Sequence, residues 1–176
     1  MGPCYNAPGQ GSPLGGPAPE GDGLLLIGLI ACAVLVADLL SKHWVAAHLV
    51  PGQSVPILPG VLWLNYVRNS GAAFGLLQGQ TLLFVVIAVA VVTLILTWGL
   101  RAARGVPLLA LAFGLQLGGA LGNLVDRLLY GQVIDFIQVR GFPFVFNIAD
   151  MAITVGGALF ALLVLREPAP QGPGGK

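Results

Sequence analysis

The sequence predicts an all-α membrane protein, a bundle of four transmembrane helices with a small β-sheet outside the membrane. Apolar residues make up 56% of the chain and charged residues only 9%, whereas soluble domains average about 25% charged residues. Four windows approach the roughly 20 apolar residues that cross a bilayer as a helix. Two segments between these windows contain short runs with strand periodicity.

The flanking segments and the charge define the rest of the organisation. Residues 1–23 are rich in Gly and Pro and are expected to form a disordered N-terminal extension. The membrane domain is expected to span residues 24–166, and residues 167–176 form a short C-terminal tail. A net charge of +1 provides no basic surface, so the expected partner is membrane lipid and not nucleic acid.

The four spans are expected at residues 24 to about 40, 81–100, 106–125 and about 148–165. An interfacial cluster with Lys42 and Trp44 follows the first span, and Arg101 and Arg104 follow the second. The third span is rich in Gly and Ala, which permits close helix packing. Cys32 lies within the first span and is expected to be a buried structural thiol.

The strand-like runs lie in the two longer connections. Residues 61–67 read VLWLNYV, and residues 133–139 alternate with period two. Because two spans separate these segments, both lie on the same side of the membrane and can form one sheet. The short hairpin at residues 101–105 lies on the other side. Counting positive charges gives a tie of four against four, so we rely on the two arginines of the hairpin and expect it to be cytoplasmic.

Carboxylates in apolar segments are costly, so each requires a structural or functional reason. Four of the seven fall in or beside such segments: Asp38, Asp126, Asp135 and Asp150. Asp38 precedes Lys42 by one helical turn, where an ion pair can form. Asp126 lies beside Arg127 and close to Asn123, and is expected to orient Arg127 or to brace the loop.

Asp135 and Asp150 have no obvious cationic partner nearby in the sequence, although Arg140 remains a candidate. Two carboxylates brought together in apolar surroundings share a proton, so that one acts as a base toward water and the other as an acid. This is the chemistry of aspartic peptidases. The alternative is that they are two unrelated interfacial aspartates.

Other catalytic chemistries lack their residues. His43 and His48 have no Cys or acidic companions for a zinc site, and no serine lies in a Gly-x-Ser-x-Gly elbow. We therefore expect no zinc site at these histidines. The small residues around Asn69 and Gly71 indicate either a turn or a loop that covers the substrate.

Five blocks, in order, resemble those of the signal peptidase II family, over nearly all of residues 24–165. They are D-x-x-x-K (Asp38, Lys42), N-x-G-A-A-F-G (Asn69, Gly71, Ala72, Ala73, Phe74, Gly75), GGALGNLVDR (residues 118–127), G-x-V-x-D-F-I (Gly131, Val133, Asp135, Phe136, Ile137) and F-N-x-A-D (Phe146, Asn147, Ala149, Asp150). The chain departs from the family pattern in its N-terminal extension and in a short stretch between Asp135 and Asp150.

The resemblance implies a function and a set of site residues. Asp135 and Asp150 correspond to the catalytic pair of the family. The substrate-binding residues are Asn69, Asn123, Arg127 and Asn147, and the supporting residues are Asp38, Lys42, Asp126, Gly71 and Phe74. The implied substrate is a prolipoprotein with diacylglycerol on its lipobox cysteine, cut just before that cysteine.

The same resemblance implies a location. It places the protein in the bacterial inner membrane, with the sheet as an extracytoplasmic cradle near the active site and with both termini in the cytoplasm. It implies no metal or cofactor.

Three other functions remain as alternatives. An intramembrane protease of the presenilin kind requires a G-x-G-D block and more spans, which the sequence lacks. A small proton-coupled transporter would use intramembrane aspartates as a relay; inverted repeats would favour it, but the two halves of the sequence show none. A non-catalytic membrane assembly factor would not need Asp135 and Asp150 together.

Overall fold

A computed structural model describes residues 22–71 and 77–166 of the chain. Four of its helices are long and apolar enough to cross a membrane, as the composition predicts, at Gly23–His48, Thr81–Ala102, Pro107–Tyr130 and Ile148–Arg166. The expectations for Phe74, for the extension up to residue 21 and for the C-terminal tail concern residues outside this description.

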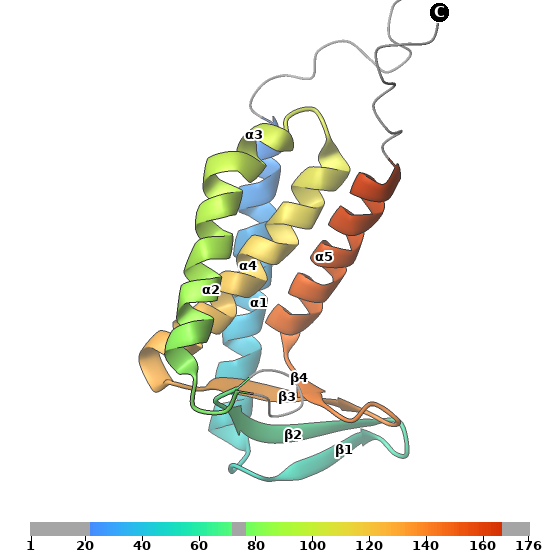
Figure 1. Cartoon of the computed structure of the whole chain (residues 1–176). Helices are drawn as coiled ribbons and strands as arrows, with labels where there is room; N and C mark the ends of the chain where they lie inside the picture. The colour runs from blue at the N-terminus through green and yellow to red at the C-terminus, as the bar shows by residue number, and fades with distance from the viewer. Residues whose placement is uncertain (1–21, 72–76, 167–176) are drawn as a thin grey trace, which may run out of the picture.

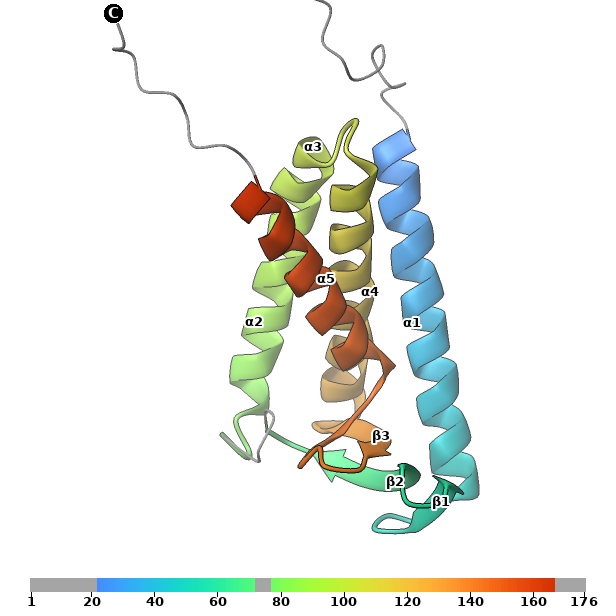
Figure 2. The same cartoon turned by 90° about the vertical axis from the view of Figure 1, so that its right-hand side faces the viewer.

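The helices form a bundle around α4 (Pro107–Tyr130), which packs against α1 (Asp22–His48), α2 (Thr81–Leu94) and α5 (Ile148–Arg166) (Figure 2). Glycines on α4 allow the close approach that its composition predicts. A Cβ on Gly118 would lie 2.6 Å from the carbonyl oxygen of Ala31, and one on Gly119 would lie 2.5 Å from that of Ala149. The two glycines thus allow α1 and α5 to pack closely on neighbouring faces of α4.

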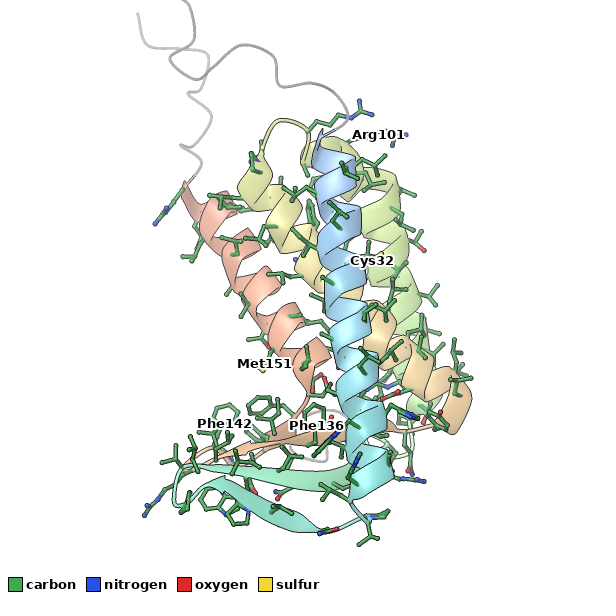
Figure 3. All side chains as sticks on the ribbon, turned by 180° about the vertical axis from the view of Figure 1, so that it is seen from behind. Cys32, Arg101, Phe136, Phe142 and Met151 are labelled. Carbon is green, nitrogen blue, oxygen red and sulfur yellow. The ribbon has the colours of Figure 1, made fainter. Side chains whose placement is uncertain are left out.

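The hairpin between α2 and α4 lies at one end of the bundle. The chain continues from α2 through a turn of π-helix (Ile95–Gly99) into α3 (Leu100–Ala102), and Gly105 then turns it into α4 with a φ of +72°. Arg101 lies at this end, far from the sheet (Figure 3). Cys32 is exposed on the outward face of α1, so the expectation of a buried thiol is wrong. In a membrane span such an outward apolar face contacts lipid and not protein.

A four-stranded antiparallel sheet lies across the other end of the bundle (Figure 1). Its strands, in spatial order, are β1 (Ser54–Leu58), β2 (Leu62–Asn69), β3 (Val133–Val139) and β4 (Val145–Phe146). The two connections expected to share one side of the membrane do meet here, since β2 pairs with β3. The sheet is larger than expected because β1 and β4 add a strand at each edge.

Two of the helices extend further than hydropathy predicts. Helix α1 continues to His48, and Val45 in its last turns packs with Tyr66 and Phe136 of the sheet to form a second small core. Helix α4 continues to Tyr130 and ends at Gly131, which has a φ of +70°. These added turns place polar side chains of both helices beneath the sheet.

Candidate active site

Asp135 and Asp150 line the same cavity, of about 580 Å³, at the junction of the sheet and the bundle. Asp135 lies on β3, in a buried position of the alternating strand pattern, and is 3% exposed. Asp150 lies in the first turn of α5, which begins two residues after the end of β4. The fold therefore brings together the two aspartates that the sequence singles out, from two different elements.

Asp150 and Asn147 form a reciprocal cap at the start of α5. The side-chain oxygen of Asn147 accepts a hydrogen bond from the backbone N–H of Asp150 at 2.8 Å. One carboxylate oxygen of Asp150 accepts a hydrogen bond from the backbone N–H of Asn147 at 3.3 Å. This is the geometry of a capping box, here with Asn and Asp, and it fixes the Asp150 carboxylate at the positive end of the helix dipole.

Three asparagine amides bind the two carboxyl groups. Asn147 Nδ2 donates to Asp135 Oδ1 at 2.7 Å, and Asn69 Nδ2 donates to Asp135 Oδ2 at 2.9 Å. Asn123 Nδ2 donates to Asp150 Oδ1 at 2.8 Å. Asn147 thus contacts both aspartates and links them.

Burial in the first place, and the nearby carboxylate of Asp150 in the second, together raise the pKa of Asp135 to about 7. The hydrogen bonds from Asn69 and Asn147 oppose this shift in the pKa, as does the charge of Lys42. Near neutral pH, Asp135 can therefore hold or release a proton while it lies beside a second carboxyl group. Aspartic peptidases use such a pair.

Beneath the pair lies a buried ion cluster centred on Lys42, which is 2% exposed. Its ammonium lies 2.7 Å from Asp38 Oδ2, which confirms the predicted ion pair, and 3.0 Å from Asp126 Oδ2. Asp126 Oδ2 also accepts a hydrogen bond from the backbone N–H of Ile134 at 3.2 Å. Of the two roles expected for Asp126, this contact fits the bracing of the segment after α4.

Arg127 reaches the cavity wall from the last turns of α4. Its Nη2 donates to the carbonyl oxygen of Gly71 at 3.4 Å, and its guanidinium lies 4.8 Å from the centre of the Phe84 ring. The Gly71 N–H in turn donates to Asn69 Oδ1 at 2.9 Å. The described start of the Gly- and Ala-rich loop thus borders the cavity, next to Asp135.

Arg140 does not join the pair. It lies beyond the far end of β3, and its Nη1 donates to the carbonyl oxygen of Gly60 at 3.4 Å. Within residues 22–71 and 77–166, no group of three or more His, Cys, Asp or Glu side chains is arranged to hold a metal ion. His48 instead stacks on Trp44, with a ring separation of 4.5 Å.

An apolar wall of the cavity was missed by the sequence reasoning. It comprises Phe142, Phe144, Val145 and Phe146 beside β4, together with Met151, Ile153, Thr154 and Val155 on α5. Phe142 and Met151 lie at the sheet end of the molecule, beside the start of α5 (Figure 3). The spacing of the three phenylalanines in FPFVF was the available signal, because every second residue of an extended segment points the same way.

Comparisons with known proteins identify the family of the chain. A family model described as "Signal peptidase (SPase) II" matches residues 30–166. The lipoprotein signal peptidase of Syntrophomonas wolfei is 48% identical over 76% of this chain and 89% of its own length. That of Moorella thermoacetica is 44% identical over 82% of this chain and 95% of its own.

The fold has a solved counterpart as well. A structure described as a bacterial membrane enzyme, determined by the in meso method, superimposes with a TM-score of 0.77 at 31% identity. The match covers 89% of this chain and 95% of that one. With a family match over most of its length and two well-covered relatives, the chain belongs to the signal peptidase II family of aspartic peptidases.

Proposed function

We propose that this protein is a membrane aspartic endopeptidase that removes signal peptides from diacylglyceryl-modified prolipoproteins, cutting before the lipidated cysteine. Asp135 and Asp150 are its catalytic dyad. One observation carries the proposal: both aspartates line one cavity and are linked through the amide of Asn147. Family membership and the names of the relatives supply the substrate class.

The two environments assign different roles to the aspartates. Asp135, with a pKa raised to about 7 by burial and by Asp150, holds the shared proton and donates it to the peptide carbonyl. Asp150 accepts hydrogen bonds from Asn123 Nδ2 and from the Asn147 backbone, which hold its carboxyl group in place as the base that activates water. Asp150 then gives the proton that it took from water to the leaving amine, and Asp135 regains its proton from the tetrahedral diol as the C–N bond breaks.

The apolar wall suits a lipidated substrate. Met151, Ile153 and Val155 line the cavity and are 47%, 37% and 56% exposed on a membrane-spanning helix. The wall of the cavity therefore continues into the surface of α5 that contacts lipid. The acyl chains of the substrate can remain in the bilayer while the peptide bond beside the cysteine reaches the dyad.

We also propose an orientation in the bacterial inner membrane. The hairpin with Arg101 and Arg104 faces the cytoplasm, together with both termini, because short loops with positive charges remain inside. The sheet and the dyad then lie at the extracytoplasmic face, where water for hydrolysis is present. Arg127, Asn69 and Asn123 bind the substrate peptide from the cavity wall. Asn147 was expected to bind the substrate too, but it is fully buried and does not line the cavity, so its role is to hold the dyad.

A proton-coupled transporter fits the structure less well. In the described part of the chain, the buried polar side chains are Asp38, Lys42, Asn123, Asp126, Asp135 and Asn147. All belong to the network at the sheet end of the bundle. A proton path would need such groups along the full length of the spans.

A cleavage assay tests the proposal. Detergent-solubilised protein is given a synthetic precursor whose lipobox cysteine carries diacylglycerol, and the same peptide with a free thiol. We expect cleavage of the first peptide only, before the cysteine, as read by mass spectrometry. Asp135→Asn and Asp150→Asn should each reduce turnover by at least about 100-fold. Asp22→Asn, the same change at the opposite end of α1, is the control and should cleave normally.

Retention of more than about a tenth of the wild-type turnover in either dyad variant would refute the assignment of the dyad. Equal cleavage of both peptides would refute the substrate class.

A further inference from the structure

The backbone next to each aspartate of the dyad is held by another, non-catalytic aspartate. The N–H of Ile134, which precedes Asp135, donates to Asp126 Oδ2 at 3.2 Å. The N–H of Ala149, which precedes Asp150, donates to Asp38 Oδ1 at 2.9 Å. Strand β3 and helix α5 are therefore each anchored one residue away from the dyad.

Lys42 joins these two anchors to each other. Its ammonium forms ion pairs with Asp38 Oδ2 at 2.7 Å and with Asp126 Oδ2 at 3.0 Å. Its third contact is a hydrogen bond that it donates to Asn123 Oδ1 at 3.0 Å. Lys42 is 2% exposed and Asp38 is fully buried, so water does not compete for these contacts.

The third contact determines how the Asn123 amide is oriented. An ammonium can only donate, so the oxygen of the amide must face Lys42. The same oxygen also accepts a bond from Asn147 Nδ2 at 3.2 Å. The NH₂ group of Asn123 is then directed at Asp150 Oδ1, to which it donates at 2.8 Å. A reversed amide would bring its oxygen against the Asp150 carboxylate.

We infer that Lys42 is a positioning residue of the dyad, which orients the Asn123 amide toward Asp150 and links the anchors of β3 and α5. The inference rests on the proposed function of Asp135 and Asp150. It differs from a simple structural role, in which Lys42 only compensates the charges of two buried aspartates. That role requires an ammonium near Asp38 and Asp126 but does not require its contact with Asn123.

A double variant that keeps the wild-type net charge of the cluster separates the two roles. Asp126→Asn removes one negative charge, and its amide oxygen can still accept from Ile134. Adding Lys42→Met restores the original net charge of the cluster and removes the contact with Asn123. We expect kcat of the double variant to be at least tenfold below that of Asp126→Asn, with KM within threefold. The yield of monodisperse protein should be similar. Equal kcat in the two would overturn the inference.

A double-mutant cycle tests whether Lys42 acts through Asn123. The same comparison is repeated with Asn123→Ala present in both proteins. Lys42→Met should then cost less than twofold in kcat, because the amide that it orients is already absent. A loss as large as in the first comparison would contradict the inference.

A further variant covers the case in which Lys42→Met does not fold. Lys42→Arg keeps the charge, but its planar guanidinium cannot reproduce the three contacts of an ammonium. We expect kcat to fall at least fivefold at unchanged thermal stability, and wild-type kcat would overturn the inference. Asp135→Asn and Asp150→Asn are measured in the same assay. If they still cleave, the proposed function fails whatever Lys42 does.

Discussion

Asn147 uses its side-chain amide twice, once to cap α5 and once to bind Asp135. Its oxygen accepts from the Asp150 backbone, and its NH₂ group donates to Asp135 Oδ1 at 2.7 Å. Loss of an N-cap costs about 1 kcal/mol of stability, which a folded bundle can tolerate. Loss of the same amide also separates the two carboxyl groups from their common partner, so its effect on catalysis is expected to exceed its effect on folding.

Asp135 imposes a cost on stability that depends on pH. Its pKa is raised from 3.8 to about 7, chiefly by burial, so the folded protein binds a proton between these values that the unfolded chain releases. The free energy of unfolding therefore falls as the pH rises through this window.

Asp135→Asn does not titrate and is expected to lose this dependence. The melting temperature of the variant minus that of wild type should be several degrees larger at pH 8 than at pH 5. Cleavage should be lost at both pH values. Thermal unfolding in detergent at the two pH values measures the difference. A difference that does not change with pH would show that Asp135 has an ordinary pKa.

Asn69→Ala is expected to shift the pH dependence of cleavage. The hydrogen bond from Asn69 Nδ2 lowers the pKa of Asp135, so its removal should raise that pKa. The charges of Asp150, which raises the pKa, and of Lys42, which lowers it, are unchanged in the variant. Because Asp135 acts in its protonated form, the alkaline limb of kcat/KM should move to higher pH and the maximum should fall severalfold. The measurement is a pH profile from 5 to 9. An unmoved limb together with reduced thermal stability would mean that Asn69 only turns the chain.

Local spacing predicts one pair in the buried network but not the rest. The pair of Asp38 and Lys42 follows from their separation by one helical turn, and the structure confirms it. Asp126 reaches Lys42 from a helix that is distant in the sequence. The backbone N–H groups of Ile134 and Ala149 leave no mark in a sequence, because every residue except proline has one. The contacts that join elements therefore required the three-dimensional structure.

At the scale of the elements, hydropathy locates the helices but ends two of them too early. The sequence suggests an interface near Lys42, because a charged side chain normally marks the end of a span. In the structure α1 continues to His48, and Lys42 is buried against α4. In the sequence alone, a charged residue that is buried with distant partners cannot be distinguished from one that lies at the membrane interface. The third span was likewise predicted to end at residue 125 because the charged Asp126 follows, whereas α4 continues to Tyr130.

Gly122 on α4 is expected to tolerate no side chain. A Cβ at this position would lie 2.5 Å from Asp38 Oδ2, and Asp38 is held in place by Lys42 and by the Ala149 backbone. Gly122→Ala should therefore displace Asp38 and lower kcat/KM at least tenfold. Gly157→Ala is the matched control, because it makes the same change in a helix and its Cβ would meet no atom within 4 Å. Since Ala favours helix over Gly by about 1 kcal/mol, the control should keep full activity and equal or higher stability. Equal activity of the two variants would show that Asp38 can move without consequence.

The strands were predicted where their pattern is regular. β3 occupies the alternating run at residues 133–139, and β2 overlaps VLWLNYV. β1 contains Pro56, which argues against a central strand but is permitted at an edge. β4 has only two residues, too few for any periodicity. The central strands could therefore be read from the sequence, whereas the edge strands depend on their neighbours.

At the scale of the whole molecule, the chain separates two environments along one axis. No residue of α2 is buried within the protein, and its exposed side chains are apolar except for Thr93, which suits contact with lipid. The buried polar side chains gather instead at the sheet end of the bundle. This separation allows a water-dependent reaction beside the bilayer without opening the bundle to water.

The orientation of this axis is the last prediction. Val106 beside the hairpin and Ile57 on β1 lie at opposite ends of the molecule and are 42% and 50% exposed. Val106→Cys and Ile57→Cys are introduced separately after Cys4 and Cys32 have been replaced, so that each protein has one thiol and keeps its hairpin arginines. A membrane-impermeant maleimide applied to spheroplasts should label Ile57→Cys and not Val106→Cys, because the positively charged hairpin is expected in the cytoplasm. Lysis should make Val106→Cys reactive, which controls for burial of the thiol. Labelling of Val106→Cys in intact spheroplasts would reverse the topology and place the dyad at the cytoplasmic face.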